Sequence, residues 1–283
     1  MTADLRTIDV LHLGQPGVVA CFQHGSVLVD PGPGSSFATL LGELGDEVPE
    51  AIFLTHIHLD HAGATGALVR RWPHLRVVVH ERGARHLADP SKLIESATRI
   101  YGDDMDRLWG EIVPVPQANL TIIGDAALIE DLGGPWRVAY TPGHASHHVA
   151  YFHEPSGTLF AGDVAGVRLG GGPVLPPTPP PDIDLEAWAA SIALLRSWGA
   201  ARLAVTHFGV FDDVEGQLTE LEDTLTLLGA AARRTDDEGY AALIRGIVRR
   251  SADPGLAAAT LQAMPPETLW SGLDRYWQRR DGA

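Results

Sequence analysis

The segment His56-Ile57-His58-Leu59-Asp60-His61 places three imidazoles and a carboxylate within six residues, directly after an apolar run that ends at Leu54. Neutral imidazole nitrogens and carboxylate oxygens are the ligands that zinc and similar divalent cations accept in proteins. A short loop with both ligand types can supply two adjacent cations. The alternative is a solvated loop whose histidines cluster by chance, and four ligand-type residues in six positions make that interpretation the weaker one.

Three further ligand-type residues occur downstream, each after a short apolar run. His144 follows the run 137–140, Asp163 follows 158–161, and His207 follows 201–205. Short apolar runs that end in turn residues are typical of strands. The repeated order of strand, turn and ligand therefore predicts that every candidate ligand lies on a loop held by a rigid scaffold.

This order of ligands resembles the metallo-β-lactamase-fold hydrolase superfamily, whose signature is an HxHxDH loop followed by single His, Asp and His ligands. The resemblance covers about residues 8–210. It implies a first metal ion held by His56, His58 and His144, a second held by Asp60, His61 and His207, and the Asp163 carboxylate as a bridge between them. It also implies a catalytic role for Asp60, which would orient a hydroxide nucleophile and receive its proton.

The aspartate at position 163 separates the branches of this superfamily. Asp163 resembles the glyoxalase II, lactonase and ribonuclease Z branches, whereas the zinc β-lactamases carry a cysteine there. The only cysteine in this chain, Cys21, lies far upstream. The di-iron flavoprotein branch has a glutamate where this chain has His58. The resemblance thus favours an ester-type hydrolase over an antibiotic-hydrolysing enzyme.

Strands that alternate with helices predict an α/β protein, and the resemblance implies a four-layer αββα sandwich of the metallo-β-lactamase fold. We expect residues 1–211 to form the catalytic domain and residues 212–283 to form a small helical C-terminal extension. Helical spacing in that extension is evident at 218–228, 240–248 and 269–277. Helices are also predicted over 63–72 and from Asp184 to Gly199.

Residues 81–117 look like an insertion between strands, and their apolar spacing predicts two amphipathic helices. This insertion is a candidate lid, with Tyr101 and Trp109 as candidate substrate contacts; the alternative is that most of its side chains merely pack on the sheet. His147 and His148 lie close to His144 in sequence. Either could support the ligands or contact substrate, although neither matches a ligand position of the family.

Two segments are expected to support the candidate ligands. Asp30 ends a predicted strand, and the resemblance implies that it hydrogen bonds to the ligand loop; the alternative is a simple turn or cap residue. The stretch Gly170 to Pro181 is rich in glycine and proline and excludes regular helix or central strand. It follows Asp163 and is therefore expected to pass near the metal site.

Composition limits the classes of partner. A net charge of −15, with arginines scattered rather than clustered, disfavours nucleic acid as a partner and makes the nuclease branches less favoured without excluding them. One cysteine cannot form an internal disulfide, and no apolar stretch approaches the roughly 20 residues that span a bilayer. Residues 1–6 lack the pattern of a secretory leader. We therefore expect a cytoplasmic protein without membrane association, and the sequence does not predict an oligomeric state.

These observations predict a binuclear metal-dependent hydrolase with a small-molecule substrate. Two divalent cations are expected, zinc first, with iron or manganese as alternatives. The preferred bond is a thioester, as in hydroxyacylglutathione hydrolase, or a lactone or other ester. The chain departs from the glutathione-specific pattern, because its sole lysine, Lys92, lies in the insertion. A phosphodiesterase or endoribonuclease is the alternative, and a non-catalytic metal-binding protein is a third hypothesis.

Overall fold

The computed structural model describes residues 5–251 and 253–282, which form two six-stranded sheets with helices outside them. The first sheet has the order β1-β2-β3-β4-β5-β6. Its strands are β1 (Leu5–Asp9), β2 (Ala20–His24), β3 (Val27–Val29), β4 (Ala51–Phe53), β5 (Arg76–His80) and β6 (Leu120–Ile123). Pairing is antiparallel from β1 to β3 and parallel from β3 to β6.

The second sheet has the order β12-β11-β10-β9-β8-β7. Its strands are β7 (Leu128–Ile129), β8 (Trp136–Tyr140), β9 (Val149–His153), β10 (Thr158–Phe160), β11 (Arg202–Val205) and β12 (Gly209–Phe211). Pairing is antiparallel except between β10 and β11, which are parallel and joined by a helical crossover. The strands expected before the candidate ligands are all present.

Side-chain alternation along the strands explains why the sheets have apolar material on both faces. In the first sheet, Phe22, Val29 and Phe53 belong to a cluster that also contains residues of the second sheet, while the intervening Cys21, Leu28 and Ile52 pack toward helices. Phe53 meets Trp136 of the second sheet with ring centroids 5.1 Å apart. Both sheets are therefore buried on two faces, as a layered α/β fold requires.

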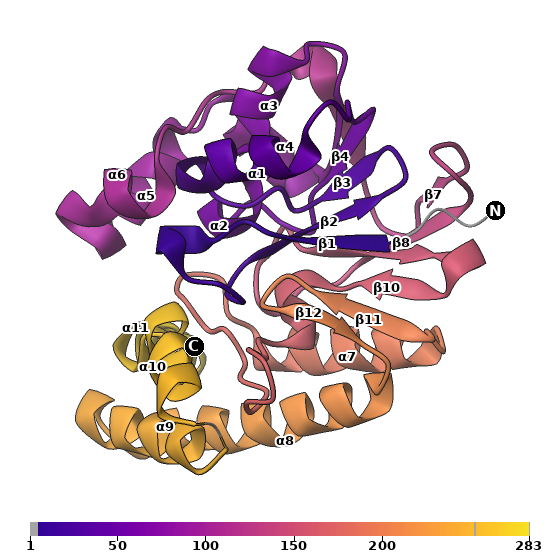
Figure 1. Ribbon diagram of the computed structural model, residues 1–283. Helices are drawn as coiled ribbons and strands as arrows, with labels where there is room; N and C mark the ends of the chain where they lie inside the picture. Colours follow the sequence, from indigo (N-terminus) through magenta and orange to yellow (C-terminus); the bar gives the residue numbers. More distant parts are fainter. Residues whose placement is uncertain (1–4, 252, 283) are drawn as a thin grey trace.

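Helices cover the outer face of each sheet, which gives the four-layer αββα sandwich that the sequence predicted (Figure 1). Over the first sheet lie α1 (Phe37–Leu44), α3 (Thr65–Arg71) and α4 (Glu81–Ala88), and below the second lie α7 (Leu185–Ser197) and α8 (Val214–Ala232). The Asp184 carboxylate caps α7 by accepting from the Ala187 amide, as expected. That helix ends at Ser197 rather than Gly199.

The insertion contains one more helix than the two predicted. The apolar faces read from the sequence correspond to α5 (Ser91–Tyr101) and α6 (Met105–Trp109), but α4 precedes them. The sequence of α4, ERGARHLA, buries only Gly83, Ala84 and Leu87, so its apolar stripe was too narrow to recognise. The helix predicted over 63–72 is present as α3, and a further short helix, α2 (Leu59–Ala62), precedes it.

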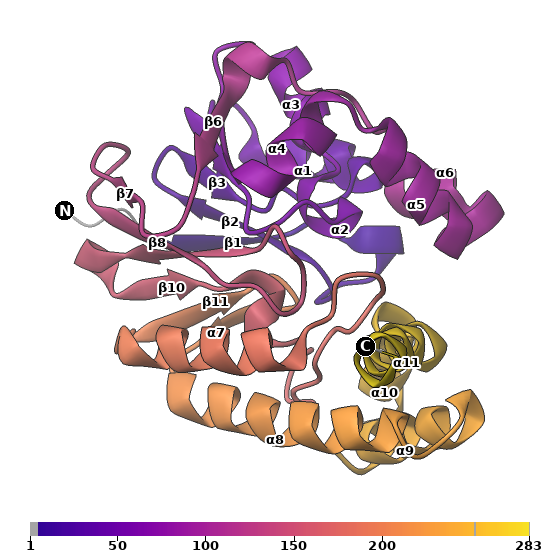
Figure 2. The same ribbon diagram turned by 180° about the vertical axis from the view of Figure 1, so that it is seen from behind.

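Four helices, not three, make up the described part of the chain after residue 212. They are α8, α9 (Asp237–Ser251), α10 (Pro254–Ala263) and α11 (Pro266–Asp281). The Asp253 carboxylate caps α10 by accepting from the Gly255 and Leu256 amides. Helices α10 and α11 lie on the same side of the molecule as α5 and α6, with the loops of both sheets between the two groups (Figures 1 and 2). Within the described ranges, no helix combines the length and the apolar character needed to cross a bilayer.

Candidate metal centre

The candidate ligands come from loops that follow four different strands. The segment after β4 carries His56 and His58, and α2 then begins at Leu59, so that Asp60 and His61 lie in a single helical turn. His144 follows β8, Asp163 lies in a short 3₁₀ turn after β10, and His207 follows β11. Neighbouring strands thus deliver side chains from residues 56 to 207 to one edge of the sandwich.

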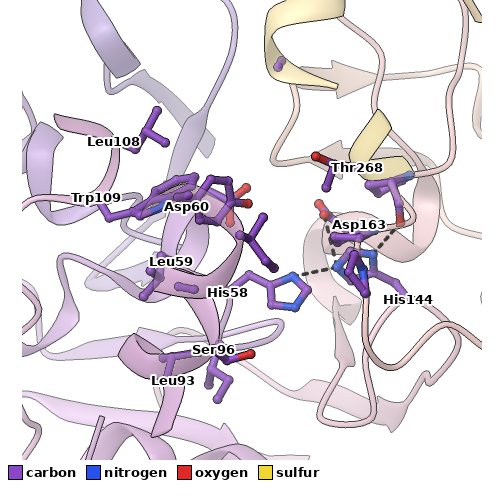
Figure 3. Close-up of a pocket in the computed structure, with 18 of the residues that line it drawn as sticks. His58, Leu59, Asp60, Leu93, Ser96, Leu108, Trp109, His144, Asp163 and Thr268 are labelled. Atoms are coloured by element: carbon purple, nitrogen blue, oxygen red, sulfur yellow. Dashed lines mark hydrogen bonds and ion pairs between the residues drawn. The ribbon is translucent and has the colours of Figure 1, made fainter. Parts of the chain in front are cut away.

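The seven side chains form three overlapping groups whose ligand atoms all lie within 4.8 Å of one another. The groups are His56, His58 and His144; His56, His61 and Asp163; and Asp60, His61 and His207. Asp163 lies between the two outer groups: its Oδ2 is 3.4 Å from His144 Nε2 and its Oδ1 is 3.2 Å from His61 Nε2. Asp60 Oδ2 lies 3.3 Å from His207 Nε2. Figure 3 shows His58, His144 and Asp163 directed toward one point.

Hydrogen bonds on the far side of the rings set which nitrogen faces the centre. His144 Nδ1 donates to the Pro177 carbonyl at 2.8 Å, and His207 Nδ1 donates to the Val18 carbonyl at 2.8 Å. His61 Nδ1 donates to Asp30 at 2.8 Å. Because each Nδ1 carries the proton, each Nε2 presents a lone pair to the centre, which is the arrangement that orients histidine ligands of metals.

Asp30 ties three parts of the site together. Its carboxylate accepts from the Thr55 amide at 2.8 Å, from the Thr55 hydroxyl at 2.7 Å and from the Thr206 hydroxyl at 2.9 Å, in addition to His61. The Thr55 hydroxyl has only one proton, so it accepts from His56 Nδ1 at 3.1 Å. Asp30 therefore orients His61 directly and His56 through Thr55, which favours the supporting role over a simple turn residue.

Several nitrogen and oxygen atoms of the site cannot all be satisfied by hydrogen bonds to one another, but they could bind a cation. His61 Nε2 and Asp163 Oδ1 are buried without a hydrogen-bond partner. His58 Nδ1 lies 3.0 Å from His56 Nε2 and 2.9 Å from His144 Nε2, and a single proton on His58 could serve only one of those two lone pairs. Buried polar atoms are normally satisfied. Converging lone pairs with unpaired buried atoms are the donor set of a divalent-metal site.

The electrostatics of the centre favour positive charge. Burial, aided by neighbouring histidines, lowers the pKa of His58 to about 4 and holds the pKa of His56 well below 6.5. Burial would raise the pKa of Asp163, but His61, His144 and His207 outweigh it and keep that pKa well below its usual range. Burial would likewise lower the pKa of His61, and the carboxylates of Asp163, Asp60 and Asp30 outweigh it and raise that pKa well above 6.5. His56 and His58 are therefore neutral and Asp163 is ionised, as metal binding requires, whereas His61 must lose its second proton when a cation binds at its Nε2.

The centre opens into a cavity of about 1160 Å³. Its walls come from the insertion, the N-terminal segment around His12, the proline loop 177–182 and the start of α11. Figure 3 shows Trp109 and Leu108 near Asp60, Leu93 and Ser96 below them, and Thr268 of α11 across the cavity. A volume at the upper end of the usual range for ligand pockets suits a substrate well beyond the size of a simple acyl group.

An aromatic wall lies beside Asp60. His12 stacks on Trp109 with centroids 5.6 Å apart, and Tyr101 meets the same indole edge-on at 5.1 Å. Trp109 Nε1 and His12 Nδ1 are buried without a partner. Burial, together with the Asp60 charge, raises the pKa of Tyr101, so its hydroxyl stays protonated. Tyr101 therefore brings a hydrogen-bond donor to the cavity, whereas the Trp109 ring contributes apolar surface and its N–H is covered.

The structure separates the two histidines that the sequence treated alike. His147 lines the cavity, and its Nδ1 accepts from the Ile57 amide at 3.4 Å. His148 is not among the lining residues: it is fully buried behind His56 and hydrogen bonds to Thr141 at 2.9 Å. The expectation that His148 contacts substrate is therefore wrong, because β9 begins at Val149 and draws this side chain inward.

The contribution of α11 to the site had no signal in the sequence. The Thr178 hydroxyl donates to the Leu269 carbonyl at 2.9 Å, and a Cβ added at Gly272 would lie 2.0 Å from the Thr178 carbonyl oxygen. Thr178 directly follows Pro177, whose carbonyl orients His144. The proline loop does pass the metal site, as expected, and α11 fixes it there. His12 was also missed, since a lone histidine is more often an ordinary packed residue.

Comparisons with known proteins agree with this geometry. One relative is the "Metallo-beta-lactamase fold-containing protein ST1585" of Sulfurisphaera tokodaii, 32% identical over 62% of this chain and 65% of its own length. The crystal structure of ST1585, under the name Sulfolobus tokodaii, superposes with a TM-score of 0.72 at 24% identity and covers 96% of this chain and 99% of that one. The family protein TTHA1429 of Thermus thermophilus gives a TM-score of 0.68 at 24% identity, with coverage of 99% and 94%.

A curated hydroxyacylglutathione hydrolase of a Synechococcus species is 31% identical over 49% of this chain and 43% of its own length. The chain thus spans less than two thirds of each of these curated relatives. The family model described as the metallo-beta-lactamase superfamily matches residues 17–207, which is more than half of the chain and includes every candidate ligand. This protein belongs to the metallo-beta-lactamase superfamily.

Proposed function

We propose that this protein is a binuclear metal-dependent hydrolase of an ester-type bond: a thioester, a lactone or another ester. The main support is the overlap of the three ligand groups: His56 and His61 each belong to two of them, and Asp163 lies between the two outer groups. The first cation would be held by His56, His58 and His144. The second would be held by Asp60, His61 and His207, with Asp163 available to both.

Two divalent cations supply an activated water nucleophile near neutral pH and polarise the oxygen of the bond to be cleaved. The protein supplies the positions of these groups. The carbonyls of Pro177 and Val18 fix the rings of His144 and His207, and Asp30 fixes that of His61. Zinc is the first candidate for both positions, and iron or manganese are alternatives for ligands of this kind.

Asp60 is the proposed general base. Its side chain is 25% exposed, against 4% for Asp163, so it is the candidate ligand carboxylate with more access to the cavity. Burial would raise the pKa of Asp60, but His61 and His207 outweigh it, so the group is ionised at neutral pH and can accept a hydrogen bond from a water nucleophile. The hydroxyl of Tyr101 stands near it as a donor for a polar group of the substrate.

Support for an ester-type substrate comes from the aspartate at position 163 and from the likeness of about half of the chain to hydroxyacylglutathione hydrolases. No observation in the site favours phosphodiester or RNA cleavage, and the net charge of −15 opposes binding to a phosphate backbone. A purely metal-binding role leaves the large cavity and the accessible Asp60 without a purpose.

The test is hydrolysis of four substrates by protein whose metal content has been quantified: an S-hydroxyacyl-glutathione thioester, an aryl ester, a lactone and bis(p-nitrophenyl) phosphate. We expect turnover of at least one ester-type substrate at two metals per chain. Turnover of the phosphodiester alone would assign the protein to the nuclease-like class. Bound metal without turnover of any of the four would favour the non-catalytic hypothesis.

Two substitutions test the assignment of ligands. Asp163→Ala is expected to remove most bound metal and most activity, because the carboxylate reaches toward both ligand groups. Asp60→Asn is expected to keep the first metal but to reduce kcat by about 10²-fold or more, the usual contribution of a positioned base. A fully active Asp163→Ala variant with normal metal content would refute the binuclear assignment.

A further inference from the structure

Four cationic side chains of the insertion line the cavity, and one of them, Arg107, is paired with Asp104 at 2.9 Å. The other three are Arg82 and Arg85, which lie one turn apart on α4, and Lys92, which lies in the first turn of α5. All three are exposed, and no ion pair is recorded for any of them within the described residues. Arg99, the arginine of the insertion that does not line the cavity, pairs with Glu95 at 2.9 Å.

The packing of α4 explains how these charges come close to the metal centre. A Cβ added at Gly83 would lie 2.9 Å from Ile57 Cγ2 and 3.6 Å from His147 Cβ, so α4 rests directly on the ligand loop. Ile57 is the residue between His56 and His58. Arg82 and Arg85 flank this contact, and the Arg82 guanidinium lies over the Tyr140 ring at 5.5 Å. Helix α4 therefore brings Arg82 and Arg85 close to His147 and the ligand loop.

The acidic groups nearby leave this part of the cavity wall positive. Asp182 lines the cavity but is engaged, because its Oδ2 accepts from the Ser146 hydroxyl and from the Ser146 amide at 3.3 Å. Asp89, close to Lys92, accepts from the Ser91 amide at 3.1 Å. Glu81 is the one lining carboxylate outside the candidate ligands for which the described residues offer no recorded partner. Three cations without an ion pair face one free carboxylate, in a chain whose net charge is −15.

We propose that Arg82, Arg85 and Lys92 form an anion subsite, which binds a carboxylate or phosphate group of the substrate at a distance from the bond that is cleaved. This proposal rests on the proposed function and names the substrate class: an ester or thioester with a negatively charged remote group. Guanidinium forks match the oxygens of either anion, and an ammonium group adds a point charge. The part of the wall with Trp109 and Leu108 is mainly aromatic and apolar, and its one cation, Arg107, is paired with Asp104, so it offers an anion less than the subsite does.

The kinetic test compares two chromogenic esters of similar length, the mono-4-nitrophenyl ester of glutaric acid, which keeps a free carboxylate, and 4-nitrophenyl pentanoate. For the wild type we expect kcat/KM to favour the charged ester by about tenfold, the equivalent of about 1.4 kcal/mol. In Arg85→Gln/Lys92→Gln that preference should fall to about twofold or less through a higher KM for the charged ester alone. Arg99→Gln is the matched control on α5 and should keep the preference.

Two further measurements separate the subsite from a general effect on the enzyme. Added salt should reduce the preference of the wild type, because exposed charges are screened, and should leave the neutral ester unaffected. A variant with Arg85→Lys in place of Arg85→Gln should recover part of the preference for the charged ester that the double variant loses. Hydrolysis of both esters by the wild type with equal kcat/KM, or a preference that the double variant retains, would overturn the subsite.

Calorimetric titration of the metal-loaded proteins with glutarate and with inorganic phosphate distinguishes failure of the subsite from failure of the proposed function. If neither these esters nor the thioester and lactone tested above are hydrolysed, the ester-type function fails. The subsite then stands if the double variant binds either anion several-fold more weakly than both the wild type and Arg99→Gln, and it falls if all three proteins bind alike. The anion with the larger difference identifies the remote group as carboxylate or phosphate.

Discussion

The insertion and the C-terminal extension both border the cavity, but they are attached to the molecule in different ways. In α5 and α6 only Ala97 and Trp109 are buried, and they form a small separate cluster with Leu59. Helix α11 buries Leu269, Leu273 and Tyr276 in the main core, which it shares with the sheets.

The insertion and the extension also differ in how they contact the segments that hold the candidate ligands. Helix α4 of the insertion rests on the ligand loop, whereas α5 and α6 pack on Leu59, and the Ser35 hydroxyl donates to the Leu108 carbonyl at 2.7 Å. In the extension, the Leu269 carbonyl accepts from Thr178 of the proline loop, and Arg279 donates to the Ile183 carbonyl directly after that loop. The same loop orients His144. We therefore expect α5 and α6 of the insertion to vary with the substrate, whereas α11 belongs to the framework of the metal site.

The largest expected effect comes from adding a methyl group where α11 meets the proline loop. Gly272→Ala forces the Thr178 carbonyl away and with it the acceptor of His144, so metal affinity should fall by about tenfold or more, as for other outer-shell changes. Overpacking should also cost about 1–3 kcal/mol of unfolding free energy. Calorimetric metal titration and thermal unfolding measure the two effects.

Gly66→Ala is the matched control for this substitution. A Cβ there would lie 1.9 Å from the Val113 carbonyl oxygen, so the steric conflict is equally severe but falls on the insertion. We expect a similar loss of stability with metal affinity changed by less than about twofold. Equal losses of metal affinity in both variants would break the comparison between the two walls.

Removing the metal should affect the two walls unequally. A bound cation stabilises the segments that hold its ligands, since binding to the folded state alone adds to stability. After chelation, hydrogen exchange should accelerate more in residues 175–183 and in α11 than in α5 and α6. Equal acceleration in both regions would indicate that the insertion is coupled to the metal as tightly as the extension is.

A smaller and more specific effect is expected at the aromatic wall. Tyr101→Phe removes a hydroxyl at the cavity wall and keeps the packing against Trp109, so metal content and stability should change little. Because that hydroxyl is the proposed donor near Asp60, kcat/KM should fall by about 2- to 10-fold, the value of one ordinary hydrogen bond. Unchanged specificity in both Trp109→Ala and Tyr101→Ala would refute a role for the insertion as a lid that contacts substrate.

The smallest effects are expected at surface ion pairs of the two regions. Arg70 pairs with Glu111 of the insertion at 2.8 Å, and Arg245 pairs with Glu267 of α11 at 2.7 Å. Exposed pairs contribute little because solvent and salt screen them. Arg70→Ala and Arg245→Ala should each leave the thermal midpoint and the metal content unchanged within error. A clear loss of metal in Arg245→Ala alone would show that the extension is held more by charge than by its buried face.

The candidate ligands and the strands before them could be predicted from the sequence because their signals are local. His56, His58, Asp60 and His61 lie within one turn and a short loop, and each later ligand directly follows an apolar run. Local spacing of this kind survives without knowledge of the tertiary fold. Helices α4 and α10 were not predicted, because their apolar faces are narrow and their local spacing therefore gives no clear signal.

The sequence by itself determined the ligand types, their order along the chain and the layered α/β architecture. Only the tertiary structure decided which ring nitrogen faces the centre, that His148 is buried while His147 lines the cavity, and that Gly272 and Thr178 support His144. The walls of the cavity combine residues near positions 12, 90 and 268. Contacts between segments so far apart arise from side-chain packing, which no periodicity within a single segment records.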